Sequence, residues 1–373
     1  MSSKVTRRSL LGATLVSAIS IGCRQKATAF PGYALVVTGL SRELAVVDLA
    51  AFALSGKIAF PEPVSQVLYR AQGPVVYALS GPAGQLHEFN WTERKVTRTI
   101  SVGERARSMR FDHEQKYLWI SVEAPASMVC VPVEDFRVAQ RVALDRPAAN
   151  FDLSPYFPHL AASLDGGGLA MVADTATPVV KLLREQETFG PMRFRSDGRQ
   201  VIAANHSGNS LSFVRASDQA SLVDLPIAMR ARDLCFTPDG GQLFVTDGER
   251  DGITIVYPYS TEVDRSVLAG KSPGAMYACE NPPYLLAANR LSSDITVLDV
   301  VSGKLVAIVP VGNAPGFLAV TPDQQYVLAL NEGSGDMAVI RLANVRSLRN
   351  KTAPLFTMVP VGESPRSLVV IPA

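Results

Sequence analysis

The chain has 373 residues, of which 47% are hydrophobic and 19% are charged. This composition can bury a large core, so it indicates a folded globular protein and excludes extended disorder. The 36 basic and 34 acidic residues leave a formal net charge of +2, and like charges do not gather in long runs. Because the sequence lacks the excess of basic residues that is typical of proteins that bind polyanions, we expect no nucleic-acid partner.

The first 22 residues are typical of an export signal. The letters TRRSLL, which contain Arg7 and Arg8, resemble the twin-arginine export motif. An apolar stretch over residues 10–22 follows, and it is too short to span a bilayer as a helix. We therefore predict a twin-arginine signal peptide over residues 1–22.

Two processing sites are compatible with this signal. The letters SIGC, which end at Cys23, resemble a lipoprotein signal box, and they favour a lipid on Cys23 with residues 23–32 as a linker. The alternative is ordinary cleavage after Ala29, which would release a soluble periplasmic protein. We favour lipidation because the cysteine ends the apolar stretch directly. We therefore expect a periplasmic or cell-surface protein that meets the membrane only through a lipid anchor, with a soluble periplasmic protein as the alternative.

The rest of the chain consists of repeats. When the units are aligned, one column contains the equivalent residue of each unit: Gln66, Ser108, Asn150, Pro191, Asp233, Ala275, Phe317 and Ser367. The intervals between successive members of this column are 42, 42, 41, 42, 42, 42 and 50 residues. Each unit has an apolar pair, a turn such as TPDG at 237–240, a second apolar run and two further β-rich runs. The pattern predicts four short strands per unit.

Four-stranded units of this length are typical of a β-propeller, in which each unit forms one blade of a ring. The chain begins inside a unit, because Tyr33 aligns with Tyr326 of a second strand, and residues 361–373 supply the missing inner strand. We predict an all-β, eight-bladed propeller of four-stranded blades over residues 33–373, closed by the C-terminal strand in the N-terminal blade.

Seven blades are the alternative to eight if one weak unit, residues 61–100 or 145–184, does not form. The 50-residue interval predicts a surface insertion of about eight residues around 344–354, between outer strands.

Several motifs of the repeat resemble those of the YVTN-type β-propeller proteins. The matching letters are VGNAP at 311–315, TPD at 321–323, AN at 288–289 and VLDV at 297–300. The resemblance covers nearly the whole mature chain. It implies the propeller fold and a likeness to lactonase-like propellers, to the heavy chains of quinoprotein amine dehydrogenases and to the haem-d propeller domains of nitrite reductases.

The inner strands predict a channel with polar and apolar sides. Side chains alternate along a strand, so one set, for example Met192 and Phe194, should pack between blades and the other should face the channel. Charged members of the second set should lie in water, because burial between apolar blades would cost too much free energy. The candidate ligand-binding residues are Arg110, Asp152, Arg193, Arg195, Asp233 and Tyr277.

The charged candidates come from successive blades, whereas the last three inner strands supply mostly apolar or small residues. The charges could form ion-pair ladders that hold neighbouring blades, or they could bind an anionic or carbonyl-bearing ligand. The loops before the inner strands add a basic set that would suit an acidic ligand or lie in solvent: Arg105, Arg107, Arg146, Arg230, Arg232, Lys271 and Arg366.

Other sites are not indicated. The four histidines, His87, His113, His159 and His206, lack the spacing of zinc ligands, so we predict no metal. Motifs for haem attachment, phosphate-binding loops and nucleophile elbows do not occur, so we predict no cofactor bound by this chain. We expect Cys130, Cys235 and Cys279 to be free thiols.

Three functional classes are compatible with the sequence. The first is a binding or scaffolding module that engages an envelope protein or a small anionic ligand at the channel mouth, as a monomer. The second is a lactonase-like hydrolase that would use Arg110, Asp152, Arg193 and His206. The third is a non-covalent subunit of a periplasmic redox enzyme whose cofactor lies on another chain. The sequence does not decide whether the protein is an enzyme.

Overall fold

The computed structural model of the protein describes residues 29–39, 41–345 and 353–373. The predicted export motif with Arg7 and Arg8 and the predicted lipidation site Cys23 lie outside these residues. In the part of the chain that is described, no helix combines the length and apolar character needed to cross a membrane.

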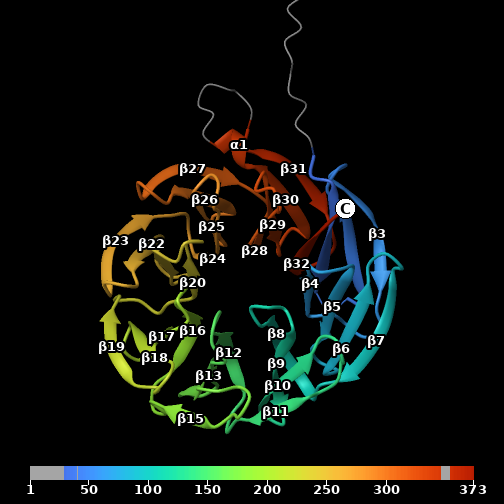
Figure 1. The fold of residues 1–373 in the computed structure, drawn as a ribbon. Coiled ribbons are helices and arrows are strands. Elements are labelled where there is room, and N and C mark those ends of the chain that lie inside the picture. Colours follow the sequence, from blue (N-terminus) through green and yellow to red (C-terminus); the bar gives the residue numbers. More distant parts are fainter. Residues whose placement is uncertain (1–28, 40, 346–352) are drawn as a thin grey trace, which may run out of the picture.

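The described strands form eight antiparallel sheets of four strands, arranged as a ring (Figure 1). The prediction of eight blades is therefore confirmed, and both weak units form blades. Blade 1 contains strands from both ends of the chain: β1 (Gly32–Thr38), β2 (Glu43–Asp48), β3 (Ala53–Ala59) and β32 (Pro365–Pro372).

The other seven blades each contain four consecutive strands, and the first of each four is the inner one (Figure 1). Blade 2 contains β4 (Gln66–Arg70), β5 (Val75–Ser80), β6 (Gln85–Asn90) and β7 (Lys95–Ser101). Blade 3 contains β8 (Glu104–Phe111), β9 (Tyr117–Ala124), β10 (Ser127–Pro132) and β11 (Gln140–Ala143). Blade 4 contains β12 (Ala148–Leu153), β13 (Leu160–Leu164), β14 (Leu169–Val172) and β15 (Val180–Leu183).

Blades 5 to 8 follow the same order around the ring: β16 (Phe189–Phe194), β17 (Gln200–Asn205), β18 (Ser210–Arg215) and β19 (Ser221–Pro226); β20 (Asp233–Phe236), β21 (Leu243–Thr246), β22 (Gly252–Tyr257) and β23 (Glu262–Leu268); β24 (Pro273–Ala278), β25 (Tyr284–Asn289), β26 (Asp294–Asp299) and β27 (Lys304–Pro310); β28 (Pro315–Val320), β29 (Tyr326–Asn331), β30 (Asp336–Arg341) and β31 (Leu355–Pro360). A short helix, α1 (Leu342–Val345), follows β30, where the sequence predicted an insertion.

The two ends of the described chain close the ring as predicted. β1 pairs with β2 on one side and with β32 on the other, and Tyr33 lies opposite Ile371 in the second pair. The backbone N–H of Ala373 also donates to the carbonyl oxygen of Pro31 at 3.0 Å. This pairing leaves no open sheet edge at the junction of the chain ends.

The core lies between the blades. The second strands are apolar on both faces, and β25 and β29 are buried along their whole length. Met192 and Phe194 of β16 pack in one buried cluster with Ala161 and Leu169 of the preceding blade, as the alternation predicted. Burial on both faces accounts for the near-continuous apolar runs of these strands, and it fixes neighbouring blades against each other.

The ring has two faces that carry different loops. The turn face carries the loops from first to second and from third to fourth strands, such as 237–242 and 258–261. The crossover face carries the loops from second to third strands and the connections between blades, such as 247–251 and 269–272. The turns after the inner strands are fixed locally, because Thr237 Oγ1 donates to Asp239 Oδ1 at 2.5 Å and Thr321 Oγ1 to Asp323 Oδ1 at 2.6 Å.

Candidate functional site

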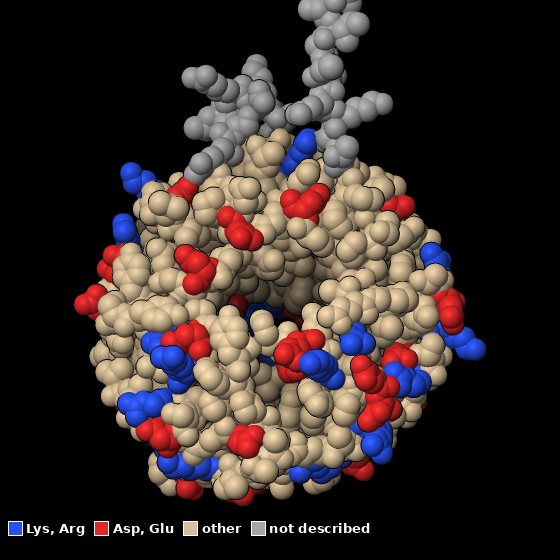
Figure 2. Space-filling model, in the orientation of Figure 1, with Lys and Arg blue, Asp and Glu red and all other residues tan. Residues whose placement is uncertain are grey.

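Four charged side chains from successive inner strands meet in the channel. Arg110 Nη1 of β8 lies 3.7 Å from Asp152 Oδ1 of β12, and Arg193 Nη2 of β16 lies 3.8 Å from Asp233 Oδ1 of β20. Figure 2 shows the ring as hollow at its centre, with basic and acidic side chains deep inside the opening. The structure thus brings together four of the six predicted ligand-binding residues, although both ion pairs are long.

The two aspartates tie neighbouring blades together. Asp152 Oδ2 accepts a hydrogen bond of 2.7 Å from the backbone N–H of Phe194, and Asp233 Oδ2 accepts one of 3.1 Å from the backbone N–H of Met276. Gln66 does the same in blade 2, because its Oε1 accepts from Met109 N–H at 2.8 Å. Each inner strand is the edge of its sheet, so these side chains satisfy donors that would otherwise lack a protein partner.

The two arginines retain donors for a ligand. Arg110 makes no hydrogen bond to any described residue, and its guanidinium lies 5.9 Å from the centre of the Phe151 ring. Arg193 donates from Nη1 to the carbonyl oxygen of Met192 at 2.8 Å and otherwise has only the long ion pair. A guanidinium has five N–H donors, so most of the donors of Arg110 and Arg193 can still bind a ligand.

The channel walls alter the proton affinities of these groups. Burial among the channel walls lowers the pKa of Arg110. The negative charge of Asp152 raises this pKa, and the positive charge of Arg193 lowers it further. Burial likewise raises the pKa of Asp233, against the opposing effect of Arg193. The Arg110 side chain is still 41% exposed, whereas that of Asp152 is 14% exposed. Arg110 is therefore a partly dehydrated cation that an anion can reach.

The channel becomes apolar beyond β20. Burial raises the pKa of the Tyr277 hydroxyl, with smaller contributions from Cys279 and Cys235. Burial also raises the pKa of Cys235 to about 12, with a further contribution from Asp233, and raises that of Cys279 to about 12. Both thiols and Cys130 are free, as expected. This sector offers a ligand contact surface rather than charge.

Arg195 lies apart from the charged channel residues. Its guanidinium donates to Asp197 at 3.0 and 2.6 Å and to Gln200 Oε1 at 3.1 Å, and it stacks over the Tyr259 ring at 4.4 Å. These partners hold Arg195 in the turn between β16 and β17. With its donors engaged in this way, Arg195 has a structural role.

Two adjoining pockets open on the turn face beside Arg110. One has a volume of about 310 Å³ and is lined by Arg110, Asp152 and His113, among other residues. The second, of about 320 Å³, shares His113 and adds the aromatic side chains of Tyr156 and Phe157. Tyr156 is 66% exposed, and its ring centre lies 5.4 Å from that of His113. Exposed aromatic side chains beside a cation can hold the apolar body of an anionic ligand.

This aromatic pocket was not predicted from the sequence. Its signal was the segment SPYFPH at 154–159, where two aromatic residues stand between prolines at the end of an inner strand. Such a segment cannot continue into a buried strand without a turn, so its aromatic side chains stay at the surface.

The predicted basic loops lie on the crossover face, at the far ends of the inner strands from these pockets. Several of them are neutralised by acids: Arg107 pairs with Glu123 at 3.2 Å and with Asp165 at 2.7 Å, and Arg105 pairs with Glu123 at 3.0 Å. Arg366 lies 3.6 Å from Glu332. This set therefore does not form the mouth that contains Arg110.

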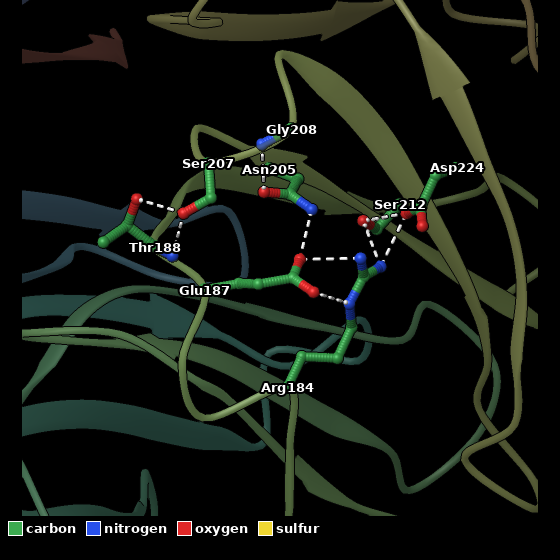
Figure 3. Close-up of polar contacts among 8 residues, drawn as sticks. All are labelled: Arg184, Glu187, Thr188, Asn205, Ser207, Gly208, Ser212 and Asp224. Carbon is green, nitrogen blue, oxygen red and sulfur yellow. Dashed lines mark hydrogen bonds and ion pairs between the residues drawn. The ribbon is translucent and has the colours of Figure 1, made fainter.

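A polar network on the crossover face of blade 5 was also not predicted (Figure 3). Arg184 Nε donates to Glu187 Oε1 at 2.9 Å, and its Nη1 donates to Asp224 Oδ1 at 2.6 Å and to Ser212 Oγ at 2.9 Å. Asn205 in turn donates to Glu187 (Figure 3). The network fixes the connection from blade 4 to blade 5 against the two outer strands of blade 5.

The repeat explains why this network exists. In blades 7 and 8 the corresponding asparagines donate to an aspartate at the start of the third strand, Asn289 to Asp294 and Asn331 to Asp336, both at 2.6 Å. Blade 5 has Ser210 at that position, so Glu187 accepts from Asn205 instead. We assign the network to blade packing rather than to ligand binding.

His206 lies far from the channel mouth that contains Arg110. Its Nε2 lies 2.8 Å from the carbonyl oxygen of Ala231 on the crossover face, so the structure does not bring His206 together with Arg110. Across the described ranges, no cluster of three or more His, Cys, Asp or Glu residues could hold a metal ion.

The closed ring of four-stranded blades defines this chain as an eight-bladed β-propeller. No family model matches the sequence, and no curated protein matches it. Among solved structures, the fold is similar to that of the dihydro-heme d1 dehydrogenase NirN in complex with DHE. That comparison has a TM-score of 0.75 and 14% identity, and it covers 91% of this chain and 75% of that one.

Two further solved structures share the fold. Apo AztD from Citrobacter koseri has a TM-score of 0.68 and 13% identity, with 92% of this chain and 98% of that chain covered. A protein described as a 6-phosphogluconolactonase of Bacteroides fragilis has a TM-score of 0.58 and 14% identity, with 92% and 99% covered. At these identities the likeness shows the propeller fold alone.

Proposed function

We propose that this protein is an exported binding module that takes a small anionic ligand at the turn-face mouth of its channel. The observation that carries the proposal is Arg110, a partly buried cation that makes no hydrogen bond to any described residue. Arg193 adds a second positive charge with unused donors. A carboxylate near both groups would gain charge-assisted hydrogen bonds that are stronger than those between neutral groups.

The pockets favour a ligand with an apolar or aromatic body. Its carboxylate would lie beside Arg110, and its body would contact His113 and Tyr156 in the adjoining pocket. The similar NirN structure is a complex with DHE, which supports a ligand-binding role for this type of propeller. Tyr277 and the apolar sector would limit water access from the other side of the channel.

Export and anchoring complete the proposal. Arg7 and Arg8 would direct twin-arginine export, and lipidation of Cys23 would hold the propeller at the periplasmic or cell-surface side of a membrane. Mass analysis and fractionation of a Cys23→Ala variant test this part. We expect the variant to lack the lipid mass and to leave the membrane fraction. A variant that stays membrane-bound would contradict the anchor and would favour another attachment.

Thermal unfolding with acetate, benzoate, citrate and phosphate tests ligand binding. We expect benzoate to raise the melting temperature of the wild type and of Arg105→Gln, a matched loss of one positive charge on the crossover face. The Arg110→Gln variant should show no such increase. An equal increase in Arg110→Gln, or no increase for any of the four anions in the wild type, would contradict the proposal.

One observation favours a hydrolase as the second candidate. His113 lines the same pocket as Arg110 and Asp152, where His206 does not lie, so an imidazole base and a cationic group share one mouth. A panel of lactone substrates tests this alternative. Hydrolysis by the wild type that falls at least about a hundredfold in His113→Gln would support it. Absence of hydrolysis would leave the binding role.

A further inference from the structure

The outer edge of blade 8 exposes apolar side chains. Phe356 and Met358 of β31 are 51% and 47% exposed, and Pro360 is exposed beside them. We call these three residues the blade 8 edge. The matching strand of blade 2, β7, instead exposes polar side chains such as Lys95 and Thr97. The outer strands β19, β23 and β27 also expose apolar side chains, so what distinguishes the blade 8 edge is its place beside the first described residues.

The first described residues enter the ring beside this edge. Phe30 is buried in the cluster between blades 8 and 1, together with Val359 of β31 and Tyr326. The Phe356 ring lies 5.1 Å from Phe52, which packs against the same cluster. Figure 1 shows β31 next to the start of blade 1, where the first described residues lie. Phe30, among the first described residues, and the blade 8 edge thus lie at one corner of the ring.

The length of the tether between Cys23 and Ala29 limits the distance to a membrane. Ala29 lies six residues after Cys23. Six residues span at most about 20 Å even when fully extended. A lipid on Cys23 would therefore hold this corner of the propeller within about 20 Å of the bilayer surface. The side of the ring formed by blades 3 to 5 would lie farther from the membrane (Figure 1).

We infer that the blade 8 edge docks on the surface of a phospholipid bilayer. The inference rests on the proposed lipidation of Cys23. Insertion of Phe356 and Met358 among the headgroups removes apolar surface from water and adds to the attachment that one lipidated residue provides. The ring then stands on its edge, with the channel axis along the membrane plane. In this orientation the turn-face mouth opens sideways, where water-soluble ligands can reach Arg110.

Depth-dependent fluorescence quenching tests the docking. The full-length lipidated protein carries an environment-sensitive dye at Met358→Cys or, as the matched control on blade 6, at Leu268→Cys, which is also exposed. Each is reconstituted in vesicles of phosphatidylethanolamine and phosphatidylglycerol that contain brominated acyl chains. We expect quenching at position 358 to exceed that at position 268 by about threefold or more, since interfacial side chains lie at the acyl boundary.

The outcomes separate docking from anchoring. Intact mass first shows whether Cys23 carries lipid, and vesicle flotation shows whether the protein is attached. A lipidated, attached protein with equal quenching at both positions would overturn the docking and leave the anchor in place. A protein without lipid at Cys23 would overturn both the anchor and the tether argument. The wild type, treated with the same dye, controls for labelling of the native thiols Cys130, Cys235 and Cys279.

Discussion

The two halves of the channel are built differently. From β8 to β20, each inner strand contributes a charged side chain, and the acids accept hydrogen bonds from the backbone of neighbouring blades. From β24 to β28, the corresponding positions hold Tyr277, Phe317 and Ala319, which are partly buried and uncharged. The same repeat and blade geometry thus support both a charged and an apolar wall.

The charged half shows how one set of channel residues can contribute both to stability and to ligand binding. Asp152 and Asp233 are committed to structure, because each satisfies a backbone donor of its neighbour. Arg110 and Arg193 balance those charges only through ion pairs of 3.7 and 3.8 Å, which leaves most of their donors unused. In physical terms, we expect substitutions of the acids to change stability, and substitutions of the arginines to change binding.

The largest stability effect is expected for Asp152→Ala. The change leaves the Phe194 N–H without its acceptor and Arg110 without its counter-charge, so the free energy of unfolding should fall by about 2 to 4 kcal/mol. Chemical denaturation measures this value. Asp165→Ala, which removes a more exposed acid on the crossover face, is the control and should cost less than about 1 kcal/mol. Equal losses would remove the distinction between the two aspartates.

The next effect concerns the Arg110 side chain. Arg110→Gln should weaken binding of an anionic ligand about tenfold or more, because a charge-assisted hydrogen bond contributes more than about 1 kcal/mol to affinity. Its free energy of unfolding should change by less than about 1 kcal/mol, since the guanidinium makes no hydrogen bond to a described residue. Calorimetric titration with benzoate and denaturation of the same preparation measure both. A large stability loss with unchanged affinity would assign Arg110 to structure.

A smaller, pH-dependent effect is expected for Asp233. Because its folded-state pKa is raised above the ordinary value of 3.8, its contribution to stability is fully present below that pH and is lost as pH rises through the folded pKa. Asparagine does not titrate and can still accept from Met276 N–H. The wild type should therefore lose stability relative to Asp233→Asn as pH rises above about 4. Thermal unfolding between about pH 4 and pH 8 measures the difference, and the opposite trend would contradict the raised pKa.

The smallest effect is expected in the apolar half. Tyr277→Phe removes a hydroxyl that makes no hydrogen bond to another described residue, so stability should change by less than about 0.5 kcal/mol. Affinity for benzoate should stay within about twofold, because the ring surface is retained. Titration of this variant beside Arg110→Gln compares the two halves directly. A loss as large as that of Arg110→Gln would extend the binding site across the channel.

The sequence was sufficient to predict the fold. A column recurring every 41 or 42 residues located the blades, and the alignment of Tyr33 with Tyr326 predicted the pairing of β1 with β32. Both signals depend on the repeat itself, since each blade buries the same positions against its neighbours. The charged inner-strand positions were predictable for the same reason, and Arg110 lies beside Asp152 as their order implied.

The detailed site depended on geometry that the repeat does not encode. The links from Asp152 and Asp233 to the next blade require the offset between adjacent inner strands, which sequence alignment does not give. The alternation of side chains along the inner strand assigned Arg195 to the channel. In the structure, Asp197 of the following turn instead holds the Arg195 side chain. The aromatic pocket combines loops of two blades, so neither loop predicted it alone.

Diffraction from crystals grown with 4-bromobenzoate tests the central claim most directly, because anomalous scattering locates the bromine and the carboxylate orients the molecule. We predict one bromine site in the pocket lined by His113 and Tyr156, with the carboxylate directed toward Arg110. Crystals of Arg110→Gln should lose this site. Bromine bound only on the crossover face, or bound unchanged in Arg110→Gln, would contradict a channel mouth that recognises anions.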